Sequence, residues 1–362
     1  MADKRVRVGI IGVGGIALGK HLPSIAKIQG VEIAAFCDVV EENAVKGRDQ
    51  YGAPGAKVFT DYRELLAEPG IDAVYVLTAN FLHAEVTVAA LEAGKHVMCE
   101  KPMAMTTAEA QAMVDAAERT GQILTIGYQN RFRPDSLHLK QLCESGALGE
   151  IYFAKALAIR RRAVPTWGNF LSKRMQGGGP LIDIGTHALD LTLWLMDNYR
   201  PKTVMGTAYH KLGQRNNAAN SWGPWDPEKF EVEDSAFGFI TFENGATVIL
   251  ESSWALNSLR VGEARTVLCG TEGGADMEDG LRINGERHGR LFTEVPDLNI
   301  GGTALDGAVS QNAGDVEAAH FIACIREGRQ PIVTPKQALV VTQILEAIYE
   351  SSRTGQAVQL GK

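Results

Sequence analysis

A glycine-rich turn near the N-terminus constrains the fold of this chain more than any other feature. The short apolar run Val6–Ile11 leads directly into Gly12-Val13-Gly14-Gly15-Ile16-Ala17. A second apolar run, Val31–Phe36, is followed by Asp38, about 20 residues beyond the turn. A strand, a glycine turn, a helix start and an acid after the next strand are typical of a Rossmann unit. The sequence therefore predicts a dinucleotide-binding α/β domain at the N-terminus.

The residues of this turn have specific expected roles. Gly12 and Gly14 let the backbone approach a pyrophosphate, and Gly15, Ile16 and Ala17 lead into the helix whose N-terminus favours negative charge. Asp38 is expected to accept hydrogen bonds from the adenosine ribose and to repel a 2′-phosphate. Val39 and Val40 supply no arginine for such a phosphate, so the cofactor is predicted to be NAD. The alternative is that Asp38 is a surface acid that only ends a strand.

A second motif places a lysine after a later strand. The run Gly94–Cys99 predicts that strand, and Glu100-Lys101-Pro102 follows it. Ligands of open α/β sheets bind at the carboxyl ends of the strands, and Pro102 restricts Lys101 to extended geometry. A lysine held near a nicotinamide can bind a substrate hydroxyl and stabilise an alkoxide. The alternative is an ordinary exposed turn lysine.

An aspartate and a histidine share a predicted helix face in the second half of the chain. The helix is expected to start at Pro180, and Asp183 and His187 are four residues apart on it. A histidine titrates near pH 6.5, which suits it to accept a hydroxyl proton at neutrality. A purely structural hydrogen bond between the two side chains is the alternative.

The chain divides into two patterns. Residues 1–129 alternate strand and helix signals, which predicts a doubly wound parallel sheet; a capping box, Thr106 with Glu109, opens one of its helices. Residues 130–362 predict an α+β substrate-binding and oligomerisation domain with a large, mainly antiparallel open sheet, including a hairpin at Glu243-Asn244-Gly245. Helices are expected near 135–145, 314–327 and 335–352, the last of which could pack on the N-terminal domain. Residues 212–231 and 296–313 are expected to be loops.

Composition narrows the possible partners and location. A net charge of −7 argues against nucleic acid or an anionic membrane as partner, and no run approaches the length of a membrane span. The five cysteines are scattered without CxxC spacing, which favours reduced thiols in a cytoplasmic protein. No zinc-type His/Cys spacing occurs, so no metal is expected.

Four segments, taken together, make the chain resemble the Gfo/Idh/MocA family of oxidoreductases over essentially its whole length. They are the glycine turn, Thr78-Ala79-Asn80 with His83, the run from Ala93 to Pro102, and the run from Gly177 to His187. The resemblance implies that Lys101, Asp183 and His187 are the catalytic set. It also implies that Thr78, Asn80, His83, Glu100 and Lys101 contribute to the cofactor site. The family commonly has Thr-Pro-Asn where this chain has Thr78-Ala79-Asn80, a backbone difference that casts little doubt on cofactor binding.

The resemblance further implies an NAD(P)-dependent dehydrogenase acting on the CH–OH group of a sugar, glycoside or cyclitol, including C3 of a glucoside. His187 would take the hydroxyl proton, Lys101 would polarise the oxygen, and Asp183 would orient the substrate or the imidazole. Tryptophan faces pack against sugar rings, and guanidinium and amide groups bind hydroxyls. The candidate substrate residues are accordingly Asn130, Arg131, Arg162 and Trp167, with Asp183 and His187. Trp222 and Trp225 could reach the pocket or a neighbouring subunit.

Two other functions remain open at this point. One is a redox-neutral glycosidase that oxidises, eliminates and reduces again, and the other is a non-catalytic ligand-sensing regulator on the same fold. The full set of proton-transfer residues argues against the regulator. A homo-oligomer (dimer, tetramer or hexamer) is expected, because the alternating apolar residues of the second sheet, among them Phe237, Phe239 and Ile249, exceed what its own helices would cover.

Overall fold

The computed structural model describes residues 5–298, 305 and 312–361, and it separates into two compact units. Unit 1 comprises Met1–Phe132 with Thr303–Leu339, and unit 2 comprises Arg133–Gly302 with Val340–Lys362. The long helix α10 (Pro335–Thr354) begins in unit 1 and continues into unit 2. Most of the expected 296–313 loop lies outside the described residues.

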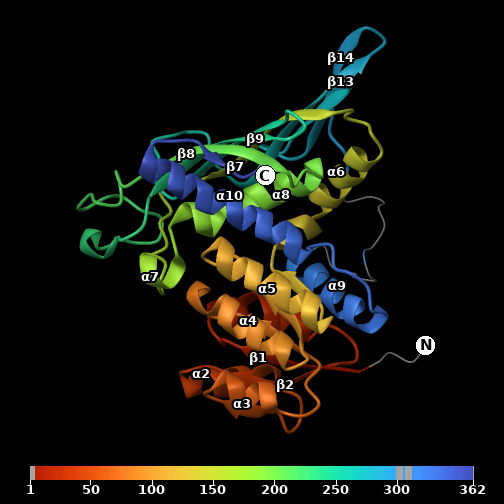
Figure 1. Ribbon diagram of the computed structural model, residues 1–362, viewed down its shortest axis with the longest axis vertical. Coiled ribbons are helices and arrows are strands. Elements are labelled where there is room, and N and C mark those ends of the chain that lie inside the picture. Colours follow the sequence, from red (N-terminus) through yellow and green to blue (C-terminus); the bar gives the residue numbers. More distant parts are fainter. Residues whose placement is uncertain (1–4, 299–304, 306–311, 362) are drawn as a thin grey trace. The chain divides into compact units, whose positions relative to one another are not determined.

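Unit 1 is built on a six-stranded parallel sheet (Figure 1). Its strands are ordered β3-β2-β1-β4-β5-β6, the Rossmann order, with the chain reversing direction across the sheet between β1 and β4. Strong β-forming runs account for the central strands β1, β2 and β4, which are almost wholly buried. The strand bounds are Val6–Ile11 (β1), Val31–Cys37 (β2), Lys57–Phe59 (β3), Ala73–Val76 (β4), His96–Cys99 (β5) and Leu124–Ile126 (β6).

Helices cover both faces of this sheet. On one face, α1 packs beside α2 and α9, and on the other α3, α4 and α5 pack in succession. The bounds are Leu22–Ile25 (α1), Glu41–Tyr51 (α2), Tyr62–Ala67 (α3), His83–Glu92 (α4), Thr107–Thr120 (α5) and Ala313–Glu327 (α9). Short segments at Ala17–His21 (η1, π-helical), Asn80–Leu82 (η2) and Gln129–Phe132 (η3) complete the unit.

Helix α9 joins unit 1 although it lies late in the sequence. Its Phe321 and Ile322 are fully buried in the same core as Val8 and Ile10 of β1. Burying side chains of this size stabilises the fold by roughly 1.5–3 kcal/mol each. Asn312 caps the helix by accepting hydrogen bonds from the backbone N–H groups of Gly314 and Asp315.

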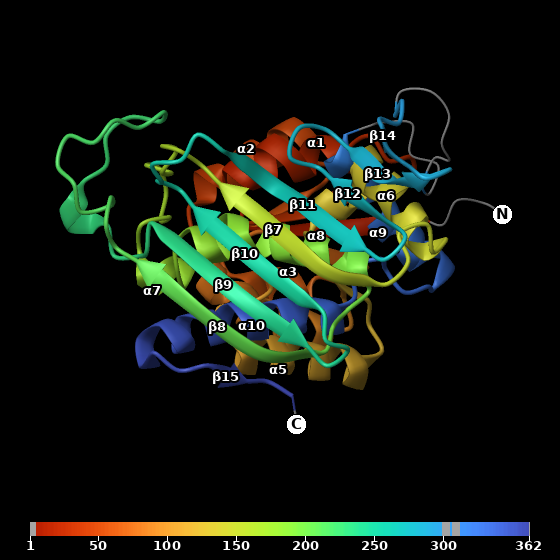
Figure 2. The ribbon, with the colours of Figure 1, turned by 90° about the horizontal axis from the view of Figure 1, so that it is seen from above.

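Unit 2 contains a nine-stranded sheet ordered β14-β13-β12-β11-β7-β10-β9-β8-β15 (Figure 2). The β7–β10 pair is parallel and the other neighbouring pairs are antiparallel. The first five strands are Ile151–Ile159 (β7), Pro201–Tyr209 (β8), Ser235–Phe242 (β9), Thr247–Ser253 (β10) and Gly262–Gly270 (β11). The others are Gly273–Asp276 (β12), Arg282–Arg287 (β13), Arg290–Glu294 (β14) and Val358–Gln359 (β15).

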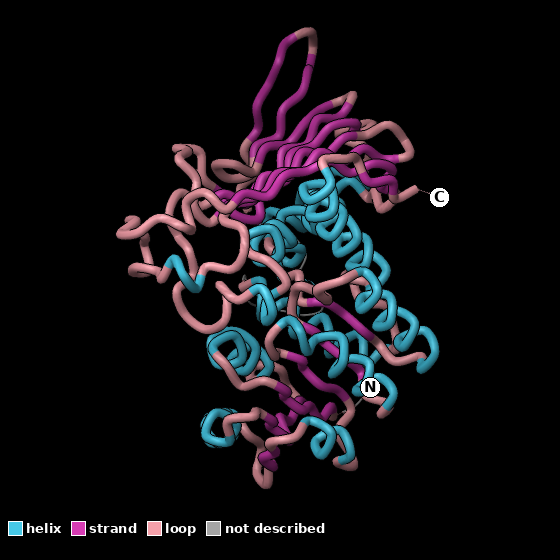
Figure 3. Tube along the Cα trace, turned by 60° about the vertical axis from the view of Figure 1, so that its left-hand side comes forward, coloured by secondary structure: helices cyan, strands magenta, loops and turns pink. Residues whose placement is uncertain are grey.

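One face of this sheet is covered by helices. Helix α8 (Thr186–Met196) lies on β7 and β11, and Ile348 of α10 packs on Gly206 and Gly238 of β8 and β9. Alternate residues of β9 follow this asymmetry, since Ala236 is buried whereas Phe239 is half exposed. The β13–β14 hairpin extends beyond the other strands (Figure 3). The remaining helical segments of the unit are Pro134–Glu144 (α6), Lys173–Gln176 (α7), Leu181–Gly185 (η4, π-helical) and Pro227–Lys229 (η5).

These observations confirm the expected fold class, a doubly wound parallel sheet plus an α+β part with a mainly antiparallel sheet. The expected strand over 151–162 ends at Ile159, because Arg162 forms only an isolated bridge with Ala255. Among the described residues, no helix has the length and apolar character needed to cross a membrane.

Candidate active site

The glycine turn that joins β1 to η1 has the geometry of a pyrophosphate cradle. Gly12 has φ of +91°, and a Cβ there would lie 2.6 Å from the carbonyl oxygen of Leu77, so only glycine fits. A Cβ at Gly14 or Gly15 would meet no heavy atom of the described residues within 4 Å, which leaves the turn open to a ligand. A tight turn followed by open backbone at a helix start fits a dinucleotide phosphate.

Asp38, at the end of β2, supports this turn directly. Its Oδ2 accepts a hydrogen bond from the N–H of Val13 at 2.8 Å, and its Oδ1 accepts one from the N–H of Val40 at 2.9 Å. Each carboxylate oxygen can accept more than one hydrogen bond, so Asp38 keeps the capacity to bind ribose hydroxyls. Val39 beside it is 85% exposed. The residues present therefore fit NAD.

A buried ionic cluster joins Lys20 and His21 of η1 to Glu100, which directly follows β5. Glu100 Oε1 accepts hydrogen bonds from Lys20 Nζ and His21 Nε2, both at 2.8 Å, and Lys20 Nζ also lies 2.9 Å from Glu317 Oε2. Burial alone would raise the pKa of Glu100, but Lys20 and then His21 hold it well below its usual range. Burial and the neighbouring Lys20 lower the pKa of His21. Glu100 is therefore an ionised carboxylate paired with the ammonium of Lys20.

This cluster positions Lys101. The backbone N–H of Lys101 donates to Glu100 Oε2 at 2.8 Å, and the residue follows β5 at the carboxyl edge of the sheet, as expected. Both oxygens of Glu100 are engaged by the protein, and the residue is buried. Glu100 thus anchors the backbone of the neighbouring lysine, and its contact with the cofactor stays a prediction.

His83 also supports this loop. Its Nδ1 lies 2.7 Å from the carbonyl oxygen of Pro102 and its Nε2 lies 3.1 Å from that of Thr78, and the side chain is buried. Burial disfavours the imidazolium, but the Cys99 sulfur and the two carbonyl oxygens outweigh it and raise the pKa of His83 to about 9. Contact of the ring with the cofactor stays a prediction. The charged ring ties the end of β4 to the Lys101–Pro102 turn.

Thr78 and Asn80 lie where the sequence analysis placed them, after β4. The Thr78 hydroxyl donates to the carbonyl of Ala79 at 3.3 Å, and Asn80 opens the short segment η2. Both are only partly buried. Their placement at the carboxyl end of a central strand keeps them candidates for cofactor contact.

In unit 2, the segment that carries Asp183 and His187 begins with a π-helical turn. Asp183 lies in η4 and His187 lies in the first turn of α8. The buried carboxylate of Glu233 caps this segment, because it accepts from the N–H groups of Gly179 at 2.9 Å and Leu181 at 3.1 Å. Tyr349 Oη of α10 donates to the same carboxylate at 2.8 Å. Burial raises the pKa of Glu233.

Asp183 is held by an indole and faces a guanidinium. Trp254 Nε1 donates to Asp183 Oδ2 at 2.9 Å, and Arg160 Nη1 lies 3.8 Å from the same oxygen. Arg160 is itself paired with Glu263 through two hydrogen bonds of 2.6 and 2.7 Å. These partners fix the orientation of the Asp183 carboxylate. The roles of Glu233, Trp254 and Arg160 could not be predicted from the sequence, because their contacts join elements far apart in the chain.

The candidate substrate residues differ in how far their side chains are exposed. Trp167 is 52% exposed, and Arg162 donates to Asn257 Oδ1 at 2.6 Å near the surface. Asn130 is partly buried in η3. Arg131 is fully buried and donates to the Ile332 carbonyl and Gln337 Oε1, so it links segments of unit 1, and its contact with a substrate stays a prediction.

Trp225 likewise has a structural role. It is 9% exposed, its Nε1 donates to the Gly213 carbonyl at 2.7 Å, and its ring packs edge-on against Phe230. Its contact with a pocket or a neighbouring subunit stays a prediction. Trp222 remains 42% exposed.

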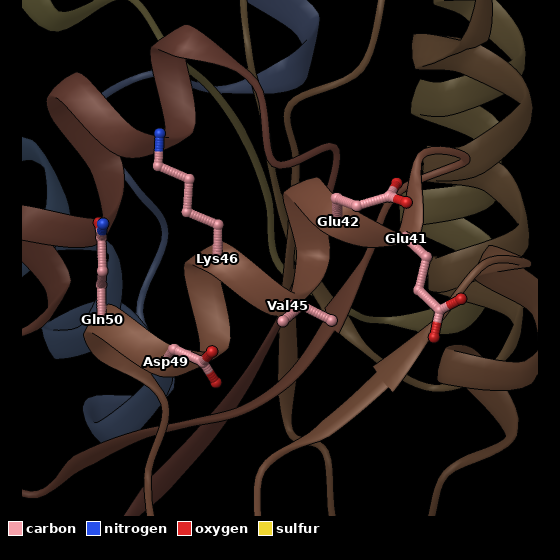
Figure 4. A pocket seen from close by; sticks show the side chains of 6 residues that line it. All are labelled: Glu41, Glu42, Val45, Lys46, Asp49 and Gln50. Carbon is pink, nitrogen blue, oxygen red and sulfur yellow. The ribbon is translucent and has the colours of Figure 1, made fainter.

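A hollow of about 500 Å³ lies elsewhere, along the surface of α2 (Figure 4). Its lining side chains all belong to that one helix, and they are Glu41, Glu42, Val45, Lys46, Asp49 and Gln50. A hollow lined by the polar face of a single helix lacks the converging groups of a binding site, and we do not assign a ligand to it. The described residues also contain no cluster of three metal-ligating side chains.

Two features, the fold and the placement of Asp38, Lys101 and the Asp183–His187 segment, define a class of protein. This class is an NAD-binding oxidoreductase with a Rossmann unit and a second α+β unit. Family models agree, since residues 6–128 match an oxidoreductase family with an NAD-binding Rossmann fold and residues 136–276 match the GFO/IDH/MocA C-terminal domain. The chain belongs to the Gfo/Idh/MocA family of NAD-binding sugar and polyol dehydrogenases.

Individual relatives span the whole chain. It is 36% identical over 364 residues to D-glucoside 3-dehydrogenase of Escherichia coli (strain K12), covering 99% of both proteins. It is 26% identical to scyllo-inositol 2-dehydrogenase (NAD(+)) of Bacillus subtilis (strain 168), covering 99% of this chain and 97% of that protein.

Among solved structures, aldose-aldose oxidoreductase from Caulobacter crescentus, complexed with glycerol, superposes with a TM-score of 0.79 at 28% identity, covering 99% of this chain and all of that one. Levoglucosan dehydrogenase in complex with NADH and levoglucosan shares the fold, with a TM-score of 0.82 at 24% identity and the same coverage.

Proposed function

We propose that this protein oxidises a secondary ring hydroxyl of a sugar, glycoside or cyclitol with NAD, and that C3 of a glucoside is the foremost candidate position. The observation that carries the proposal is the 36% identity to a D-glucoside 3-dehydrogenase across 99% of both chains. The NAD-compatible glycine turn and the anchored Lys101 and Asp183 support it.

The proposed chemistry assigns a separate task to each residue. NAD, when bound, supplies the hydride acceptor. His187 takes the hydroxyl proton, the ammonium of Lys101 stabilises the negative charge that develops on the oxygen, and Asp183 binds a substrate hydroxyl or orients the imidazole. The products are a ketone, NADH and one proton.

The test is a substrate screen followed by product analysis. Purified protein with NAD is offered methyl glucoside, glucose and inositols, and NADH is followed by absorbance. The proposal expects NADH to form one-for-one with a product lighter by two hydrogens and with the glycosidic bond intact. Release of the aglycone without net NADH would instead support the redox-neutral glycosidase, and ligand binding without any turnover would support a sensing regulator.

We further propose that the chain forms a homo-oligomer through the uncovered face of the nine-stranded sheet. Phe239 of β9 lies between Met205 of β8 and Ile249 of β10 in the pairing register. Phe239 and Met205 are each 50% exposed.

We also propose a cytoplasmic location, which the five free cysteines support. Cell fractionation tests this location.

A further inference from the structure

Two tryptophans from distant loops meet at the surface of unit 2. The ring centroids of Trp167 and Trp222 are 4.9 Å apart at an interplanar angle of 69°. The side chains stay 52% and 42% exposed. Edge-to-face packing of this kind is favourable, but leaving so much indole surface in water is not. The pair therefore presents an apolar surface without a cover from the described residues.

Hydrogen bonds hold the two loops together at this point. Asn220 acts like a strand partner of Val164, because its Oδ1 accepts from the Val164 N–H at 2.8 Å and its Nδ2 donates to the Val164 carbonyl at 3.0 Å. The Thr166 hydroxyl donates to the carbonyl of Trp222 itself at 2.7 Å. The tryptophan pair is thus pre-organised by the backbone that carries it.

The pair is connected to Asp183 by two short chains of contacts. The Arg160 guanidinium lies 5.0 Å from the centroid of the Trp222 ring and 3.8 Å from Asp183 Oδ2. On the other side Trp167 packs on Phe170, Phe170 packs on Trp254, and Trp254 donates to Asp183. Asp183 is therefore linked to the tryptophan surface within the same unit, through Arg160 on one side and through Phe170 and Trp254 on the other.

We propose that Trp167 and Trp222 form a subsite for the group carried on the anomeric carbon of the substrate, an inference that rests on the proposed glycoside oxidation. The face of an aromatic or sugar ring packs on indole, whereas free monosaccharides carry only a hydroxyl at the anomeric carbon and inositols have no anomeric carbon. The chain then selects glycosides with a cyclic aglycone over free sugars and over methyl glycosides.

The test compares phenyl glucoside with methyl glucoside in the wild-type protein and in Trp222→Ala, Trp167→Ala and Trp222→Phe. Wild type should have a kcat/KM for phenyl glucoside about five- to tenfold above that for methyl glucoside, the size of a stacking contribution. The ratio should fall toward unity in both alanine variants and survive in Trp222→Phe. Leu291→Ala, which removes an 87% exposed apolar side chain on β14, should leave the ratio unchanged.

Tryptophan fluorescence separates this inference from the proposed function. If wild type oxidises neither glucoside, the proposed function fails, yet phenyl glucoside should still quench the emission more strongly than methyl glucoside. Equal kcat/KM values with equal quenching would overturn the subsite, as would a ratio that persists in both alanine variants. A change in oligomeric state of those variants by light scattering would assign the tryptophan surface to a second copy of the chain and also overturn it.

Discussion

The Asp38 carboxylate is expected to select the cofactor while it supports the glycine turn. In Asp38→Ser with Val39→Arg, the serine hydroxyl can still accept from Val13, and the arginine can bind a 2′-phosphate. Loss of hydrogen bonds to a charged acceptor predicts a drop in kcat/KM for NAD of about 10- to 100-fold, with preference moving to NADP. Steady-state kinetics with both cofactors measure this. Equal efficiency of the wild-type protein with NAD and NADP would contradict the assignment of Asp38.

Lys101 is expected to act on the reacting oxygen. Lys101→Ala should lower kcat by about 100-fold or more, the usual effect of losing a proton-transfer or oxyanion-stabilising group. The backbone N–H that donates to Glu100 is retained in this variant, so NAD affinity should change little. Binding of NAD by calorimetry serves as the control. A nearly normal kcat with a raised KM would make Lys101 a binding residue only.

The contact between Lys20 of η1 and Glu100 after β5 is expected to behave as a buried ion pair. Removing one partner, as in Lys20→Met, should destabilise the fold by about 3–5 kcal/mol because Glu100 is left buried and uncompensated. Lys20→Met with Glu100→Gln should cost clearly less than the sum of the two single changes. Urea unfolding of the four proteins gives the cycle. As a matched control, Arg63→Met breaks the exposed Arg63–Glu85 pair and should cost at most about 1 kcal/mol. Strict additivity would contradict the buried pair.

Because the pKa of His83 is raised, we expect the free energy of unfolding to depend on pH. Its pKa is raised from 6.5 to about 9 in the folded protein, so its contribution to stability is fully present below pH 6.5 and is lost as the pH rises through about 9. That contribution amounts to roughly 3 kcal/mol at most. The unfolding free energy of His83→Gln should therefore fall less than that of wild type between these pH values. Cys99→Ala removes the first of the favourable partners and should weaken the same trend. An identical pH profile in wild type and His83→Gln would refute the charged imidazole.

Local signals in the sequence were enough for some elements and not for others. The capping box of Thr106 and Glu109 forms as expected, since both partners lie within four residues. Helix α2 was not foreseen, because only Ala44 and Gly47 of its 11 residues are buried and it lacks an apolar stripe. Glu233 caps η4 from 54 residues away, and such a pairing leaves no periodic trace.

The same limit applied to the candidate site. The placement of Asp38 after β2 and of Lys101 after β5 could be predicted because glycine turns and strand ends lie at fixed offsets in the sequence. The groups that orient Lys101 and Asp183 could not, because Lys20 and Trp254 are brought in by the tertiary fold. Arg131 illustrates the same limit, since nothing in the sequence indicates that its side chain is buried and donates to the Ile332 carbonyl.

The proposed assembly of the intact protein uses the uncovered face of the nine-stranded sheet. Phe239 and Met205, both half exposed, are directly paired across β9 and β8, and Ile249 pairs with Phe239 from the other side. A charge placed among them should oppose a subunit contact without disturbing the helix-covered face, because neighbouring residues of a strand point to opposite sides. We therefore expect wild type to scatter light as an oligomer at micromolar concentration and Phe239→Lys to shift toward the monomer. Tyr152→Phe, a mild change at a 53% exposed position of β7, is the control and should keep the oligomer. A monomeric wild-type protein would contradict the proposal, as would an unchanged oligomer in Phe239→Lys.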